Sequence, residues 1–331
     1  MIVLPAEIRP DAPAPDDQDV FLAAYLEPFR PFLDQGEVTE ILVNRPGEVW
    51  LERCGHPAME ARQVPAVSDR LLQRLATQIA RMSHQAVSRE QPLLAATLPD
   101  GARVQMIGPP ATREHWALSI RRHRLLGLPL SAWPLRGEAG GGDGHRGAAL
   151  RDDPHAWLEA AVRARRTILV AGGTSSGKTS FLNALLGLVP ASERVIVVED
   201  TPEIRLDQPN ALGLVAVRGD MGEARVTADS LLQASLRMRP DRIVLGELRG
   251  EEAVSFLRAI NTGHPGSVST IHANSPPAAL EQLALMVMQA GLGLSHDETI
   301  TYARSVIDVV VQLDRSGGHR QISDLLICAE G

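Results

Sequence analysis

Short apolar runs alternate with longer amphipathic stretches over the second half of the chain, which is typical of strands alternating with helices. The predicted strands cover residues 167–171, 195–199, 214–217, 242–246 and 267–272. The predicted helices cover residues 153–166, 178–188, 227–238, 250–262, 276–290 and 296–304. This alternation predicts a mainly parallel sheet with helices on both faces, closed by a hairpin over residues 309–314 and 320–327.

The first half shows a different pattern, in which strand periodicity comes in pairs separated by turn residues. Two hairpins are predicted, at residues 38–52 and 93–107, followed by a strand at 116–121. Between them, residues 68–84 carry an apolar stripe at helical spacing after Ser68, which is suited to cap a helix. The sequence therefore predicts a small α+β domain over residues 18–124, ahead of the α/β domain at 153–331.

Two stretches lack any such pattern. Residues 1–17 are rich in Pro, Ala and Asp and predict a flexible tail. Residues 125–152 contain the Gly-rich run 137–147 and almost no apolar periodicity, which predicts a linker between the two domains.

One motif suggests the chemistry of the second domain. The stretch Gly172-Gly173-Thr174-Ser175-Ser176-Gly177-Lys178-Thr179 follows a predicted strand and opens a predicted helix, which is the setting of a phosphate-binding P-loop. Its backbone N–H groups and the helix N-terminus suit a phosphate, the lysine would reach the β- and γ-phosphates, and Thr179 would ligate Mg²⁺. The expected nucleotide-binding residues are Gly172, Gly173, Thr174, Ser175, Ser176, Gly177, Lys178, Thr179 and Ser180.

Acidic residues end two of the other strands, where ligands bind in parallel sheets. Glu199 is the candidate to orient or deprotonate the attacking water, and Glu247 is the candidate for the Mg²⁺ shell through water. The two roles could be exchanged. His272, at the end of a further strand, is expected to contact the γ-phosphate, whereas His264 is as well suited to a structural role.

Composition narrows the class of protein. A net charge of −7 and 3% aromatic residues disfavour binding to nucleic acid over the whole surface. The two cysteines, Cys54 and Cys328, are far apart in sequence and without zinc-ligand spacing, which fits a reducing cytosol. No apolar run reaches the roughly 18–20 residues that span a bilayer, so any membrane role is expected to be peripheral or through a partner.

Three motifs after the P-loop resemble the secretion and traffic ATPases of type II and type IV secretion. They are an Asp box at 198–203, a Walker B region at 238–250, with Gly246 where an Asp is usual, and a His box at 262–272. In the first half, residues 38–44, 98–105 and 118–121 resemble the eleventh VirB component of type IV secretion and its conjugation relatives. The resemblance spans residues from about 20 to 327.

The resemblance implies a PAS-like amino-terminal domain and a RecA-like carboxy-terminal domain with nucleotide held between them. It implies a homo-hexameric ring that hydrolyses ATP with Mg²⁺ and lies peripherally at the cytoplasmic face of the inner membrane. Partners would be other secretion-system ATPases and channel components, with no sequence-specific nucleic-acid binding expected. Arg121 ends a strand just before the linker, and we expect it to reach the nucleotide phosphates from the amino-terminal domain.

Three alternatives remain at this point. The first is the assembly ATPase of a Flp-type or type IV pilus, within the same superfamily. The second is a RecA-like helicase or recombinase, which the charge and the few aromatic residues disfavour. The third is a nucleotide-gated interaction module that does not turn over.

Overall fold

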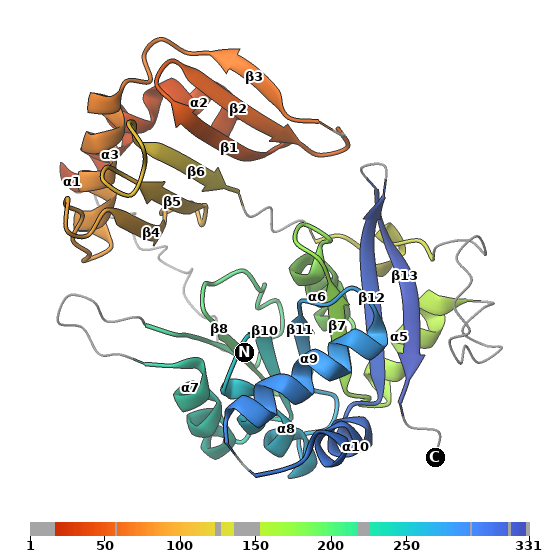
Figure 1. Cartoon of the computed structure of the whole chain (residues 1–331). Coiled ribbons are helices and arrows are strands. Elements are labelled where there is room, and N and C mark those ends of the chain that lie inside the picture. The colour runs from red at the N-terminus through yellow and green to blue at the C-terminus, as the bar shows by residue number, and fades with distance from the viewer. Residues whose placement is uncertain are drawn as a thin grey trace, which may run out of the picture. The chain divides into compact units, whose positions relative to one another are not determined.

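The computed structural model describes residues 17–56, 58–122, 127–135, 153–217, 226–291, 293–316 and 319–328. They form two compact units, with the boundary after Arg122 and the short segment 55–57 grouped with the second unit (Figure 1). The predicted tail lies outside the described residues except for Asp17, and the Gly-rich run 137–147 of the predicted linker lies outside them entirely.

A six-stranded antiparallel sheet forms the first unit, with the strand order β3-β2-β1-β6-β5-β4. Helices α1 and α3 and the short segments η1 and α2 share one apolar core with it. The elements are α1 (Asp17–Leu26), η1 (Glu27–Phe29), α2 (Arg30–Leu33), β1 (Val38–Arg45), β2 (Glu48–Arg53), β3 (Glu60–Gln63), α3 (Asp69–Met82), β4 (Leu93–Thr97), β5 (Arg103–Ile107) and β6 (Ala117–Arg121).

Helix α3 forms where the apolar stripe over residues 68–84 predicts a helix. The Ser68 hydroxyl accepts the N–H of Leu71, which satisfies one of the donors that a helix start leaves open. The stripe that includes Leu72, Leu75 and Ile79 is buried against the sheet. The sequence did not predict β3, because this edge strand is short, charged and mostly exposed.

The second unit contains a seven-stranded sheet with the order β13-β12-β7-β11-β10-β8-β9, in which only β13 runs antiparallel. Its strands are β7 (Ile168–Gly172), β8 (Val195–Glu199), β9 (Ala211–Val215), β10 (Arg242–Leu248), β11 (Val268–Ile271), β12 (Val309–Ser316) and β13 (His319–Ile327). The predicted α/β class, with a mainly parallel sheet after a smaller α+β domain, is confirmed.

Helices cover both faces of this sheet (Figure 1). One apolar cluster joins the sheet to α5 and α6, and a second joins it to α7, α8, α9 and α10. The helices are α5 (Pro154–Arg163), α6 (Lys178–Leu186), α7 (Ala228–Ser235), α8 (Glu252–Asn261), α9 (Pro276–Gln289) and α10 (His296–Val306), with short turns η2 (Leu130–Ala132) and η3 (Leu236–Met238). None of the helices that the structure describes has the length and apolar character needed to span a bilayer.

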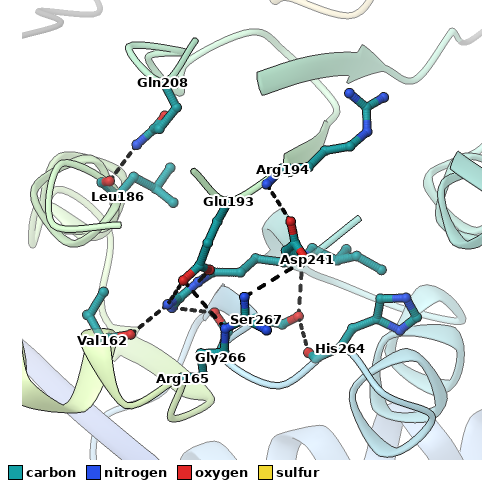
Figure 2. Close-up of polar contacts among 12 residues, drawn as sticks. Val162, Arg165, Leu186, Glu193, Arg194, Gln208, Asp241, His264, Gly266 and Ser267 are labelled. Carbon is teal, nitrogen blue, oxygen red and sulfur yellow. Dashed lines mark hydrogen bonds and ion pairs between the residues drawn. The ribbon is translucent and has the colours of Figure 1, made fainter. Parts of the chain in front are cut away.

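A buried ion pair lies where β8 and β10 begin. Arg242 is fully buried, and its Nε lies 2.6 Å from Oε2 of Glu193. The same guanidinium donates to the carbonyl oxygens of Val162 at 2.7 Å and Gly266 at 3.3 Å. Nε of Arg165 lies 3.4 Å from Oε1 of the same carboxylate (Figure 2). One side chain thus connects the ends of α5, β8, β10 and the turn before β11.

Burial by itself would raise the pKa of Glu193, but the hydrogen bond and charge of Arg242, together with Arg165, hold that pKa below its ordinary value. A carboxylate with a lowered folded-state pKa contributes stability that is complete above its unfolded pKa. That contribution is lost as the pH falls through the folded pKa.

The substitution Glu193→Gln should lower the unfolding free energy of this unit by about 3–5 kcal/mol near neutral pH, because it leaves the Arg242 charge buried and uncompensated. The difference from wild type should shrink below about pH 4, since the wild-type carboxyl then loses its own charge. Denaturant unfolding at several pH values measures the loss of unfolding free energy and its dependence on pH. Glu159→Gln, which breaks an exposed helical pair with Arg163, is the control and should cost under about 1 kcal/mol. Equal costs for the two variants at neutral pH would contradict the assignment.

Candidate functional site

The P-loop connects β7 to α6 and depends on glycine at two positions. Gly177 has φ of +89°, in the left-handed region that favours glycine. A Cβ at Gly172 would lie 2.5 Å from Oγ of Ser176 and 2.9 Å from the carbonyl oxygen of Leu313. By contrast, no heavy atom lies within 4 Å of a Cβ built at Gly173, so the loop is open beside this residue.

Lys178 is buried at the first position of α6 and its ammonium turns back into the loop. Its Nζ donates to the carbonyl oxygens of Gly172 at 2.9 Å and Gly173 at 3.0 Å. The same Nζ lies 3.3 Å from Nδ1 of His272. The charge is therefore held at the loop, where phosphate oxygens could replace the carbonyl contacts.

The segment after β8 folds back toward α6 because a buried carboxylate holds it. One oxygen of Glu199 accepts the backbone N–H groups of both Glu203 and Ile204, each at 2.8 Å. Asn183 of α6 also holds this segment, because its side-chain amide donates to the Glu203 carbonyl oxygen at 3.2 Å. As a result the Glu203 carboxylate accepts the Thr179 hydroxyl at 3.3 Å.

Glu247 lies in a distorted part of β10. The β10–β11 register shifts between Leu245 and Leu248, and the hydroxyls of Ser269 and Thr270 bond the carbonyl oxygens of Leu245 and Gly246. Such an irregularity re-aims a side chain. Glu247 is directed at the end of β11, where its Oε1 lies 2.6 Å from Nε2 of His272.

Arg249 completes a chain of charges along this edge. It donates to Glu247 through Nε at 2.6 Å and to Asp200 through Nη1 at 3.1 Å. Burial lowers the pKa of Arg249, but the carboxylates of Glu247, Asp200 and Glu203 outweigh it and raise that pKa above its ordinary value. Polar side chains from β8, β10, β11 and the P-loop therefore meet at one edge of the sheet.

The structure brings together most of the residues expected at the site. Lys178, Thr179, Glu199, Glu247 and His272 all lie at this edge, with Ser176 buried in the loop, Ser175 at a positive φ of 60°, Thr174 exposed and Ser180 on α6. At Gly246, where an Asp is usual, a Cβ would pack against Glu199 of the neighbouring strand, with Cγ of Glu199 3.4 Å away.

Two further candidate residues make contacts of their own. His264 has Nδ1 2.9 Å from the carbonyl oxygen of Ala259, a contact that holds a turn. Arg121 belongs to the first unit, where its Nε lies 3.6 Å from Oε1 of Glu40.

Glu203 was not among the expected site residues. It lies within the Asp box, but no strand or helix pattern shows that this segment folds back to Thr179. The available signal was that Glu203 is the third acid of that box.

The oxygen donors at Thr179 and Glu203 fit Mg²⁺, which prefers carboxylate, hydroxyl and water oxygens and keeps several of its own waters. Among the residues described, no group of three or more His, Cys, Asp or Glu could hold a metal ion by itself.

A parallel sheet that presents a P-loop, two acidic residues and a histidine at the carboxyl ends of its strands defines a P-loop nucleotide-hydrolysing fold. Residues 147–317 match the family described as Type II/IV secretion system protein. The PtlH homolog of Bordetella bronchiseptica is 40% identical over 94% of this chain and 96% of its own. VirB11 of Bartonella quintana is 34% identical over 91% of each chain.

Solved structures agree with these relatives. The VirB11 ATPase of the Brucella suis type IV secretion system is 36% identical, with a TM-score of 0.50 over 94% of this chain and 95% of that one. The pilus retraction motor PilT, at 18% identity and a TM-score of 0.62, covers 91% of this chain and 82% of its own, and shares the fold alone. The chain belongs to the type II/IV secretion system protein family, and the predicted class, an ATPase of type IV secretion, is confirmed.

The substitution Lys178→Ala should abolish ATP hydrolysis and weaken nucleotide binding while leaving the fold intact, since the ammonium contacts loop carbonyls and His272 but no apolar core. Phosphate release and binding of a fluorescent ADP analogue measure the two effects. Circular dichroism and thermal unfolding control for the fold. Hydrolysis at the wild-type rate would show that the P-loop is not the site.

Proposed function

We propose that this ATPase binds ATP with Mg²⁺ at the P-loop and uses hydrolysis to drive substrate transfer and pilus assembly by a type IV secretion system. The observation that supports it most directly is the convergence of Lys178, Thr179, Glu203, His272 and Glu247 at one edge of the sheet. The metal would be held by the Thr179 hydroxyl and, through water, by acidic residues, and it would neutralise phosphate charge.

His272 and Glu247 belong, in this proposal, to the γ-phosphate end. Lys178 marks that end, because a P-loop lysine serves the β- and γ-phosphates, and Nδ1 of His272 is 3.3 Å from its ammonium. Nε2 of His272 is 2.6 Å from Glu247. Glu247 would therefore lie beside a water in front of the γ-phosphate. As the base, it would orient this water and accept its proton.

Glu203 and Glu199 have different tasks in the same scheme. Glu203 lies beside the Thr179 hydroxyl and would face the metal-bound waters. Glu199 holds the returning segment through two backbone N–H groups, so we assign it a positioning role. In this proposal Glu247 takes the role of base first considered for Glu199, Glu203 takes the place near the metal first considered for Glu247, and Glu199 positions the segment.

The substitution Glu247→Gln should slow hydrolysis by about 10²–10⁴-fold, the usual effect of losing general-base help, with nucleotide affinity largely kept. Glu203→Gln should also slow hydrolysis, because it removes a negative charge that faces the metal-bound waters. Glu199→Gln should cost less than about tenfold, because an amide oxygen still accepts the two N–H groups, whereas Glu199→Ala should cost far more. Single-turnover hydrolysis and analogue binding separate rate from affinity.

Glu251→Gln, an exposed acid at the start of α8, is the matched control for these variants. A change of less than about threefold in Glu203→Gln or Glu247→Gln would remove that residue from the scheme. Equal loss in Glu199→Gln and Glu199→Ala would assign Glu199 a direct role instead. Arg121→Ala, with Arg122→Ala as its control, belongs in the same assay, because Arg121 is proposed to reach the phosphates from the first unit.

We also propose a homo-hexameric ring at the cytoplasmic face of the inner membrane, with other secretion-system ATPases and channel components as partners. The family to which the chain belongs supports this proposal. If a neighbouring subunit completes each site, the hydrolysis rate per subunit should fall when the protein is diluted below its assembly concentration. A rate per subunit independent of concentration, with light scattering showing a dissociated chain, would argue for self-sufficient sites.

A further inference from the structure

The closing hairpin of the sheet forms one wall of the P-loop. Strand β12 pairs with β7 up to Leu313 and Gly172, the last residue of the strand that leads into the loop. The Leu313 carbonyl oxygen is 2.9 Å from where a Cβ at Gly172 would be. The hairpin residues just beyond Leu313 therefore run past the phosphate-binding loop.

One face of this hairpin is directed at α6. Leu313 pairs with Ile322 across the hairpin, and both are buried in the apolar cluster that includes Phe181 of α6. Two residues along each strand, where side chains return to the same face, Arg315 pairs with Arg320. The apolar residues of this hairpin face pack against α6. The next pair of residues on the same face consists of Arg315 and Arg320.

The Arg320 side chain reaches the start of α6. A Cβ at Gly177 would lie 2.7 Å from its Cδ, 3.0 Å from its Nε and 3.4 Å from its Cζ. The guanidinium group therefore lies over the residue that immediately precedes Lys178. A side chain at Gly177 would require the flexible end of Arg320 to move, and the φ of +89° is the reason that this position favours glycine.

We propose that Arg320 binds the phosphates of the nucleotide, as a second cation delivered to the P-loop by the closing hairpin. The inference rests on the proposed ATP site. Gly177 and Lys178 belong to the turn whose N–H groups and helix N-terminus bind phosphate, so a guanidinium over Gly177 is within reach of the same anion. A planar guanidinium can make two parallel bonds to phosphate oxygens.

Several positive charges lie around this position. Arg315 lies directly opposite Arg320 across the hairpin. Lys178 and the positive end of α6 add to the same field. Two acids also belong to these segments, Asp314 beside Arg315 on β12 and Glu203, which accepts from Thr179.

The experiment measures binding of pyrophosphate and of a fluorescent ADP analogue to the full chain, the former by competition. Arg320→Ala and Arg320→Gln should each weaken both ligands by about 10- to 100-fold, the loss of one charge-assisted contact. Arg320→Lys should recover most of that loss. Pyrophosphate has no base or sugar, so weaker binding of pyrophosphate would show that Arg320 contacts the phosphates. Arg304→Ala, an exposed arginine on α10, is the control for net charge.

Each outcome of this experiment supports or overturns the proposed role of Arg320. Affinity for pyrophosphate within about twofold of wild type in Arg320→Ala, with the ADP analogue weakened, would mean that Arg320 contacts the base or sugar and would overturn the proposal. Arg320→Gln binding as tightly as Arg320→Lys would also overturn it, since charge would not be the cause. Lys178→Ala distinguishes failure of this proposal from failure of the proposed ATP site. If Lys178→Ala and Arg320→Ala both bind the ligands as wild type does, the ATP site itself is wrong. If only Lys178→Ala loses binding, the ATP site stands and the role of Arg320 is wrong.

Discussion

The parallel register of β7, β11, β10 and β8 is the constraint on which the site depends. Hydrogen-bonded pairing brings the carboxyl ends of these strands to one edge. There the P-loop follows β7, His272 follows β11, Glu247 lies near the end of β10 and Glu199 ends β8. A one-residue slip would turn every side chain of a strand to the other face. The chemistry at that edge therefore requires the register to be specified elsewhere, and the opposite edge carries the interaction that does so.

That interaction is the buried pair of Arg242 and Glu193. Strand β10 is seven residues long, about 20 Å from its start to its end at the usual rise, so the pair lies far from the nucleotide edge. A buried ion pair is poor evidence for net stability, because apolar residues of similar volume often do as well. Its hydrogen bonds to Val162 and Gly266 suit another task, since only one alignment of α5, β8, β10 and the turn before β11 satisfies them. We infer that the pair contributes specificity of register.

Sequence patterns predicted the parts of this molecule that depend on local periodicity. The alternation of strands and helices, α3 with its Ser68 cap, and the P-loop between a strand and a helix follow from spacing and residue type alone. The missed features depend on contacts between distant segments. Glu203 reaches Thr179 only because Glu199 and Asn183 fold its segment back, and Arg320 reaches Gly177 only through the register of the closing hairpin. Strand β3 was missed for a different reason, since a charged, exposed edge strand has no apolar alternation to detect.

Glycine at position 246 connects these observations. In a Walker B strand an aspartate is usual at this place, but here Glu199 of the neighbouring strand lies against it, and that carboxylate is already bonded to two backbone N–H groups. The acid beside the P-loop helix therefore comes from the returning segment, as Glu203, and the acid on β10 moves one residue on, to Glu247. Because a buried carboxylate is costly unless it is hydrogen-bonded, Glu199 is stable only while the segment is folded back. The hydrogen bonds of Glu199 thus keep Glu203 beside Thr179 and stabilise a buried carboxylate at the same time.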